Sequence, residues 1–301
     1  MAPEILDRLS LWLARRFVDV PDRDLQPVVD ALSEVFVRAR RDGFEDLLPV
    51  PYLLPQIHRF AVDLWLVLRC LDGAPRRRVA DLGCGAALVS LALHFLGHEV
   101  VPVDMPWVYD PYYFDRREAY LGRFGLRVLR ADLLNDRLPI DDDSLDVVTC
   151  NDVVEHLQGP PKRLMSEVLR VLRPGGRTAW STPNSVSLRH RLAVPFGASN
   201  YAHMPEFYET PLPYFGHVRE YTPSELAWAL ERAGMEVREI RRFNNFFKDV
   251  FRQDGTGRLL PVPYRPHGPA DCLRPIQWAL TSTVFPAAAD SFGVIASKRT
   301  R

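Results

Sequence analysis

The heptapeptide NDVVEHL at residues 151–157 places two carboxylates and an imidazole close together in the chain. Asp152, Glu155 and His156 are ligand types for a divalent metal, and a carboxylate beside an imidazole can also act as an acid–base pair. Their i, i+3, i+4 spacing would bring all three to one face of a helix. Alternatively, they are polar residues at the end of a buried strand, lining a pocket built for other chemistry.

A glycine-rich turn upstream indicates what such a pocket would hold. In DLGCGAALVS, residues 81–90, Gly83 and Gly85 fit the start of a G-x-G-x-x-G fingerprint, but Leu88 stands at the third glycine. That glycine serves close packing in pyrophosphate binders, so a dinucleotide is disfavoured. Asp104 ends the next apolar segment, where a carboxylate can accept both hydroxyls of a ribose. The pattern predicts a ribose-bearing ligand without a pyrophosphate.

Short apolar strands alternate with helices around these residues. Helices are expected within AALVSLALHFLG and PKRLMSEVLRVLRPGG, the second ending at its glycines. Strands are expected within RRRVADLGCG, HEVVPVD, LRVLRAD, SLDVVTCND, RTAWSTPN, EVREIRRF and SFGVIASKR. The alternation predicts an α/β class, with a Rossmann-like seven-stranded, mostly parallel sheet and helices on both faces.

The N-terminal part of the chain has a different pattern. Apolar residues recur at helical spacing over 3–18 and 23–41, and residues 56–71 also resemble a helix. No strand signal occurs there, so residues 1–75 are predicted to form a helical cap or lid before a main domain at 76–301.

Two long segments interrupt the main domain. Residues 185–220 are rich in Pro, Tyr, Phe and His, and are expected to cover the acceptor side of the site as a loop region. Residues 246–290 form an insertion before the last strand. Between them, Thr222 and Glu225 form an expected capping box at the start of a helix that Gly234 closes.

The composition is that of an ordinary globular protein. Hydrophobic residues make up 47% and charged residues 25%, and 38 Lys and Arg balance 38 Asp and Glu. A protein held on nucleic acid by phosphate contacts usually has a basic excess, so nucleic acid is disfavoured. The N-terminal segment lacks an uninterrupted apolar core, so no signal peptide is expected. The four cysteines form no C-x-x-C pair, which predicts reduced thiols and a cytoplasmic protein.

The motifs together resemble a known family. Asp81–Gly85, an acid-Leu-Gly-Cys-Gly stretch, is similar to the first motif of class I S-adenosylmethionine-dependent methyltransferases, specifically the ubiquinone-biosynthesis-type and general small-molecule branch. Asp104 matches the ribose-binding acid of that family. Later motifs match in order at ADLL, LDVVTCNDVVEHL, VLRPGG and GHVREYTPSELAWALERAGMEV. The resemblance covers 77–245 and the last strand, and leaves out the N-terminal helices and the 246–290 insertion.

The resemblance implies S-adenosyl-L-methionine as cofactor and S-adenosyl-L-homocysteine as product. Asp81 would orient the ammonium group, Asp104 would hold the ribose, and Asp132 with the N–H of Leu133 would meet the adenine. Backbone N–H groups at the glycine turn and helix start suit the cofactor's carboxylate. The expected cofactor-binding residues are Asp81, Gly83, Cys84, Gly85, Asp104, Met105, Asp132, Leu133, Asn151, Asp152 and His156.

Methyl transfer from a sulfonium is an in-line displacement, for which the protein supplies alignment and a dry site. A base is needed only where the nucleophile must lose a proton, and it helps an aliphatic or sugar hydroxyl most. His217 and His156 are the candidate catalytic bases, and His190 and His203 lie in the same 185–220 region. A solvated or hydrogen-bonded structural histidine is the alternative for each.

The DVVEH stretch also resembles a segment that binds a divalent ion in some ubiquinone-type O-methyltransferases. The same Glu-His pair is widespread in the superfamily without metal, and a capped helix start would use the same spacing. We therefore expect no obligatory metal and assign no metal-binding residue.

The acceptor is expected to be a small molecule, a glycan or a lipid-linked intermediate. Neither nucleic-acid methylation motif is present: the Asn/Asp-Pro-Pro-aromatic loop is missing after the fourth strand, and Cys150 has the apolar context of a core residue. Aromatic residues could stack on an apolar or sugar-bearing acceptor or pack the loop onto the sheet, namely Tyr201, Phe207, Tyr208, Tyr214 and Phe215.

The predicted function is therefore S-adenosylmethionine-dependent O-methylation. The alternatives are N-methylation of a small amine, or a methyltransferase-like module that binds without catalysing transfer. The 246–290 insertion could form a homodimer or a membrane-surface contact, and its weak basic face makes the membrane the less favoured of the two.

Overall fold

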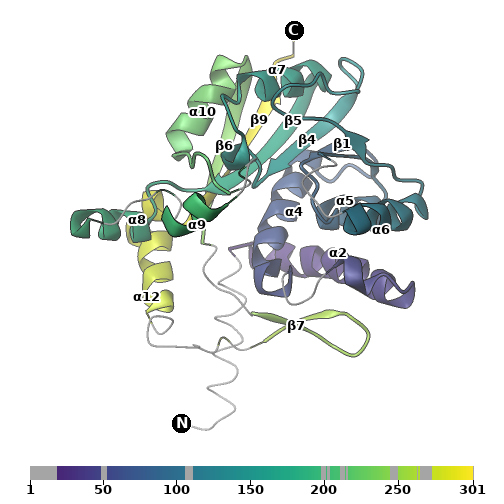
Figure 1. The fold of residues 1–301 in the computed structure, drawn as a ribbon, viewed down its shortest axis with the longest axis horizontal. Helices are drawn as coiled ribbons and strands as arrows, with labels where there is room; N and C mark the ends of the chain where they lie inside the picture. The colour runs from purple at the N-terminus through teal and green to yellow at the C-terminus, as the bar shows by residue number, and fades with distance from the viewer. Residues whose placement is uncertain are drawn as a thin grey trace.

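A computed structural model describes residues 19–48, 53–105, 111–197, 201, 204–210, 214, 216–244, 250–262, 264 and 273–300. Its centre is a seven-stranded sheet in the order β3-β2-β1-β4-β5-β9-β6 (Figure 1). The first five strands of that order are parallel, and β9 runs antiparallel to both β5 and β6. The strands are β1 Arg78–Leu82, β2 Glu99–Asp104, β3 Leu129–Arg130, β4 Leu145–Asn151, β5 Leu172–Pro183, β6 Met235–Phe243 and β9 Ser291–Lys298. The predicted fold class is confirmed.

Helices cover both faces of the sheet (Figure 1). On one face, α2 Asp22–Arg41, α4 Ile57–Leu71 and α5 Leu88–Phe95 share one apolar core. On the other face, α7 Lys162–Val171 and α10 Pro223–Arg232 pack on a second core. The buried faces repeat at helical spacing, as the sequence pattern predicted. Cys150 lies in the second core, as expected.

The N-terminal helices belong to the same packed structure as the sheet. The predicted helices at 23–41 and 56–71 are confirmed as α2 and α4, and the expected helix at 3–18 lies outside the described residues. Side chains of α2 and α4 share a core with α5 and with residues of β1, β4 and β5. The division at residue 75 stays a prediction.

The end of α7 differs from the prediction. The helix ends at Val171 and does not continue to the glycines, because Leu172 is already extended at φ −66° and ψ 132° and pairs with Leu145 of β4. Strand β5 includes Gly175 and Gly176 and is bulged there. The expected third strand is also shorter than its apolar run, since only Leu129–Arg130 pair with β2.

The two long segments contain regular structure. The first, expected as a loop, holds α8 Leu188–Ala193, a 3₁₀ turn η5 Val194–Phe196, and α9 Met204–Glu209. The second holds the hairpin β7 Phe251–Gln253 and β8 Leu259–Pro261, the helix α12 Arg274–Ala279, the π-helical turn η6 Leu280–Val284 and the 3₁₀ turn η7 Pro286–Ala288. No helix among the described residues is long and apolar enough to span a membrane.

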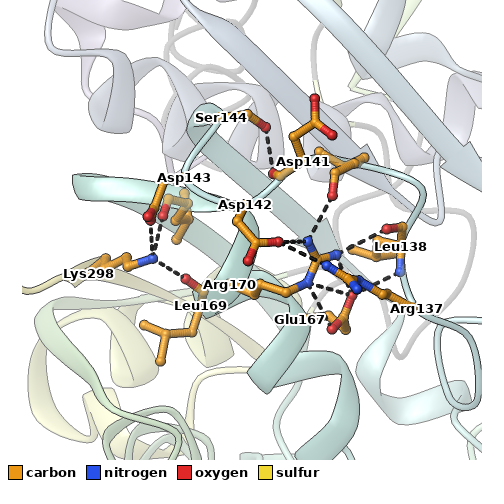
Figure 2. Close-up of polar contacts among 12 residues, drawn as sticks. Arg137, Leu138, Asp141, Asp142, Asp143, Ser144, Glu167, Leu169, Arg170 and Lys298 are labelled. Carbon is orange, nitrogen blue, oxygen red and sulfur yellow. Dashed lines mark hydrogen bonds and ion pairs between the residues drawn. The ribbon is translucent and has the colours of Figure 1, made fainter.

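Two sets of polar contacts stabilise the ends of helices α10 and α7, the second at the end of the sheet where the parallel strands begin. Thr222 and Glu225 form the predicted capping box. The C-cap residue is Ala233, and the next residue, Gly234, has a φ of +101°. At that end of the sheet, Arg170 at the end of α7 donates to the carboxylates of Glu167 and Asp142 and to loop carbonyls (Figure 2). The positive charge of Arg170 is also favourable at the C-terminus of a helix. Its hydrogen bonds connect α7 to the loop that leads into β4.

Candidate active site

The glycine turn after β1 is held by hydrogen bonds to β2. Gly83 and Gly85 adopt φ of +71° and +54°, which glycine enters without steric cost. The N–H groups of Gly83 and Cys84 donate to the carbonyl of Val103, and that of Gly85 donates to Asp104. We expected such N–H groups to receive the cofactor's carboxylate. In the structure these three are used within the protein, because the turn folds back onto β2.

Asp81 is buried at the end of β1. The hydroxyl of Ser90 on α5 donates to its Oδ2 at 2.5 Å. Burial raises the pKa of Asp81 to about 6, against the smaller lowering effect of the Ser90 hydrogen bond. The hydrogen bond from Ser90 thus offsets only part of the cost of burying an ionised Asp81. A cationic group of a ligand beside Asp81 would stabilise its ionised form.

Asp104 is buried at the end of β2 and lies in an ion pair. Nη1 of Arg117 on α6 Pro111–Gly122 donates to Oδ2 of Asp104 at 2.8 Å and also to the carbonyl of Gly85. The N–H of Met105 donates to Oδ1. Burial raises the pKa of Asp104, and Arg117 is the largest influence in the opposite direction. Arg117 thus links the ribose-binding candidate to the glycine turn.

Asp132 acts as a turn former in this structure. Its carboxylate accepts hydrogen bonds from the N–H of Leu134 and from the side chain of Asn135. Leu133 is buried beside it. The carboxylate of Asp132 already accepts two local hydrogen bonds, so an adenine amino group would have to donate to it in addition to these.

The end of β4 carries an unusual pair of residues. Both side-chain polar atoms of Asn151 are buried without a hydrogen-bond partner among the described residues. Asp152 adopts φ +48°, and its Oδ2 lies 3.1 Å from Nε of Arg59 on α4. The left-handed residue Asp152 lies just before the 3₁₀ turn η4 Val154–His156, so the chain does not continue from Asp152 into an α-helix. The expected single helical face for Asp152, Glu155 and His156 does not form.

Two further buried carboxylates surround this ion pair. Asp63 of α4 accepts a hydrogen bond from Ser181 at 2.7 Å, and Glu155 accepts one from Thr182 at 2.9 Å. Burial raises the pKa of both acids well above the usual range, and the charge of Asp152 raises them further. The charge of Arg59 opposes these shifts for both acids.

The two candidate bases lie together at the rim of this cluster. The rings of His156 and His217 meet edge to face with centroids 4.9 Å apart. Nδ1 of His156 lies 3.2 Å from the carbonyl of Gly216, and Nδ1 of His217 lies 2.9 Å from Glu220. The segment is docked because the N–H groups of residues 218 and 219 donate to the carbonyl of Glu155. His190 lies nearby, 3.8 Å from Glu220, and His203 is outside the described residues.

The same cluster has the composition of a metal site. One ligand atom each from Glu155, His156 and His217 lie within 4.8 Å of one another. Asp152, which the DVVEH spacing suggested as a ligand, is not part of this group and contacts Arg59 instead. Glu155 is also fully buried and bonded to Thr182, so metal binding would compete with existing contacts.

The residues at this edge fit S-adenosylmethionine. Asp81 and Asp104 are buried carboxylates at the ends of neighbouring strands, and the unpartnered amide of Asn151 lies at the end of the next strand. An unsatisfied buried polar group costs about 1–3 kcal/mol, which a polar ligand group would offset. When bound, the cofactor supplies a methyl group on a cationic sulfur, which the nearby carboxylates would stabilise.

Arg59, Asp63 and Arg117 were not among the residues predicted from the sequence. Arg59 and Asp63 are spaced i, i+4 on a helix whose buried residues are apolar apart from Asp63 and His58. That pair of charges on an apolar helix was a usable signal. Arg117 offered no comparable signal, because its partners lie in other elements.

Comparisons with known proteins agree with this geometry. A family model described as a methyltransferase domain matches residues 56–240. A ubiquinone biosynthesis O-methyltransferase of Burkholderia thailandensis is 30% identical over 175 residues, which is 56% of this chain and 68% of that protein. A probable S-adenosylmethionine-dependent methyltransferase of Mycolicibacterium smegmatis is 32% identical over 166 residues, 54% of this chain and 53% of that protein.

Solved structures support the fold. A putative methyltransferase from Bacillus halodurans superposes with a TM-score of 0.50 at 17% identity, covering 79% of this chain and 100% of that chain. A putative methyltransferase in complex with the Haloferax volcanii Trm112 activator also gives 0.50, at 18% identity and 91% and 98% coverage. At these identities the comparison supports the fold alone.

Proposed function

The chain belongs to the methyltransferase domain family and is an S-adenosylmethionine-dependent methyltransferase, and from this premise we propose that it methylates an oxygen of its acceptor. The acceptor would be a small molecule, a glycan or a lipid-linked intermediate. The relatives named as ubiquinone biosynthesis O-methyltransferases support oxygen over nitrogen. Family membership also favours an enzyme over a non-catalytic binding module.

The observation that carries the proposal is the histidine pair. Glu220 lies against Nδ1 of His217, an arrangement that orients the ring and leaves Nε2 as a proton acceptor. His217 is part-exposed, so an acceptor hydroxyl can reach it. An amine acceptor that is neutral on binding needs no such base, whereas a hydroxyl benefits from one.

We assign the cofactor contacts as follows. Asp104 would receive the ribose hydroxyls while Arg117 opposes the rise in its pKa, and the side-chain amide of Asn151 would form a hydrogen bond with a polar group of the cofactor. Asp81 would hold the α-ammonium group. Asp132 and Leu133 would lie against the adenine. His156 packs on His217 and would act as a positioning residue for that base.

The assignment of Asp81 predicts a pH dependence of cofactor binding. Its pKa of about 6 lies above the ordinary 3.8, so without cofactor its contribution to stability is present at low pH and is lost as pH rises through 6. A bound ammonium group favours the ionised form. S-adenosylmethionine affinity should therefore fall as pH is lowered below about 6, by at most about tenfold per unit. Calorimetric titration across this range measures it.

The matched variant is Asp81→Asn, which keeps the shape and cannot ionise. It should bind the cofactor more weakly at neutral pH and without the acid-side decline. An affinity of the unaltered protein that does not change between about pH 5 and pH 7 would contradict the assignment of Asp81.

We propose that no metal is obligatory. Arg59 already supplies a fixed cation beside Asp152, and Glu155 is bonded within the protein. Methyl transfer should therefore survive exhaustive chelation. Loss of activity on chelation, restored by a divalent ion, would instead assign Glu155, His156 and His217 as its ligands.

The function is tested with labelled S-adenosylmethionine and a panel of phenols, sugar hydroxyls and amines. Label should enter a hydroxyl compound, and His217→Gln should lower kcat by about 10²-fold with little change in the KM for the cofactor. His190→Gln is the matched control, since His190 lies near the same Glu220 but 3.8 Å away. Transfer to amines alone would support the N-methylation alternative.

A cytoplasmic location and a homodimer remain predictions. The first is supported by Cys70, Cys84 and Cys150, which are buried free thiols. Gel filtration with light scattering would measure the second.

A further inference from the structure

A cleft of about 720 Å³ lies between helices α2 and α4 and the sheet, away from the active site. Its walls come from the start of α2, the second half of α4 and strands β5, β6 and β9. We call it the arginine cleft, because Arg23, Arg69, Arg177 and Arg238 line it. Arg177 precedes Ser181 on β5, and at about 3.3 Å per residue the cleft lies roughly 13 Å from Ser181 at the active site.

Positive charge exceeds negative charge in the arginine cleft. Among the described residues that line it, five are arginine or lysine and three are aspartate or glutamate, which leaves an excess of two positive charges. The whole chain instead balances 38 basic against 38 acidic residues. A concave site with an excess of one sign of charge attracts ligands of the other sign, so the cleft favours an anion.

Two of the acidic side chains in the cleft are already held by donors of the protein. Oε2 of Glu239 accepts hydrogen bonds from Nε and Nη2 of Arg69 at 3.2 and 2.8 Å, and Oε1 accepts one from Arg241. Oδ2 of Asp24 accepts a hydrogen bond from the indole N–H of Trp65 at 3.0 Å. These contacts offset the negative charge that Glu239 and Asp24 would present to an anionic ligand.

Two of the arginines make long contacts. Nε of Arg23 lies 3.6 Å from Asp24. Arg177 donates to two carbonyls at the end of α4 at 3.3 and 3.5 Å, and its Nη2 lies 3.4 Å from Asp72, whose side chain is 78% exposed. All of these distances exceed the usual N–H···O range of about 2.7–3.2 Å. A ligand oxygen at normal distance would therefore bind either guanidinium more tightly than its present partners do.

We propose that the arginine cleft binds a phosphorylated small molecule. A guanidinium matches the oxygens of a phosphate group two at a time, and a phosphate monoester dianion balances the excess of two positive charges. The apolar side chains of Pro27, Val28 and Leu68 line the same cleft and would contact the organic part of the ligand. The volume of about 720 Å³ also lies within the range of small-molecule sites, roughly 300–1,000 Å³.

Helix α4 extends from the active site to the arginine cleft. Arg59 and Asp63 in its first half belong to the cluster of buried acids, and Trp65 and Arg69 in its second half line the cleft. A phosphate group between α2 and β5 would add contacts beside the end of α4. Because such a ligand binds only the folded chain, it should raise the Tm.

The experiment uses the full chain, with neither methyl donor nor acceptor present. The probes are inorganic phosphate, phenyl phosphate and the neutral benzyl alcohol, followed by calorimetry and thermal unfolding. Phenyl phosphate should bind more tightly than inorganic phosphate and raise the Tm more, and both effects should weaken as salt rises. Benzyl alcohol should leave the Tm unchanged. Arg23→Gln/Arg177→Gln should lower the affinity for phenyl phosphate by at least about tenfold.

The matched control is Arg127→Gln/Arg242→Gln, which removes two exposed arginines outside the arginine cleft and should bind phenyl phosphate like the unaltered protein. Arg23→Gln alone changes a side chain that is 81% exposed, so it should fold normally and lose part of the affinity even if the Arg177 variant is unstable.

Equal losses in the two double variants would overturn the proposal, because binding would then follow the overall charge of the chain. Absence of phosphate and phenyl phosphate binding would overturn it as well. Since no methyl transfer is measured, these outcomes are independent of whether the proposed function holds.

Discussion

Replacing Gly83 with alanine is expected to weaken S-adenosylmethionine binding by at least about tenfold. The added Cβ would lie 2.4 Å from Cγ2 of Val153 and would have to be held at φ +71°. The left-handed conformation costs alanine roughly 1–2 kcal/mol, and overpacking typically adds about 1–3 kcal/mol. Val153 is β-branched and has few other rotamers. The end of β4 would therefore move away from the glycine turn.

Calorimetry with S-adenosylmethionine and thermal unfolding together measure this effect. Gly73→Ala is the matched control, because Gly73 has φ +70° and an added Cβ there meets nothing within 4 Å. Gly83→Ala/Val153→Ala removes the clash and keeps the backbone strain, so it should recover part of the affinity. If Gly83→Ala and Gly73→Ala reduced cofactor affinity equally, contact between the turn and Val153 would have no special importance.

The fold and the strand-end acids could be predicted because their signals are local. A strand, a glycine turn and a helix follow one another around Asp81 and Gly83, and an acid ends the next strand at Asp104. Strands of a parallel sheet end at one edge, so their terminal side chains gather there whatever the details of packing. The same logic placed Asn151 and Asp152 at that edge.

The partners of these acids could not be predicted, because they come from distant elements. Arg59 is 93 residues before Asp152 in the chain, and their contact depends on how α4 crosses the sheet. The conformation of Asp152 shows the same limit. Periodicity suggested a helical face, but the left-handed φ of +48° turns the carboxylate toward Arg59 instead. Which side chains pair across different elements depends on how those elements pack, and residue spacing in the sequence does not contain that information.

Arg59 is expected to be the most important single charge for the stability of the site. Its guanidinium lies 3.1 Å from Asp152, whose side chain is 11% exposed, and it also lowers the pKa of buried Asp63 and Glu155. Breaking a buried ion pair by removing one partner typically costs about 3–5 kcal/mol, because the other charge stays buried. Arg59 itself is about one-quarter exposed, so we expect roughly 2–3 kcal/mol for Arg59→Met at neutral pH.

The size of this deficit should depend on pH. The folded-state pKa of Asp63 and of Glu155 lies above the ordinary value, so each contributes stability at low pH that is lost as pH rises through that pKa. Arg59 reduces this loss by stabilising the ionised forms. The difference in Tm between Arg59→Met and the unaltered protein should therefore shrink as pH is lowered and grow as pH is raised.

A double-mutant cycle separates the ion pair from packing. Asp152→Asn keeps the size of the side chain, and asparagine tolerates the left-handed conformation, so Arg59→Met/Asp152→Asn should recover much of the loss. Denaturant unfolding of the two single variants and the double variant measures the coupling. The ion pair would make no contribution if the loss in free energy of unfolding of the double variant equalled the sum of the losses of the two single variants. Arg59 would then stabilise α4 through packing of its hydrocarbon stem alone.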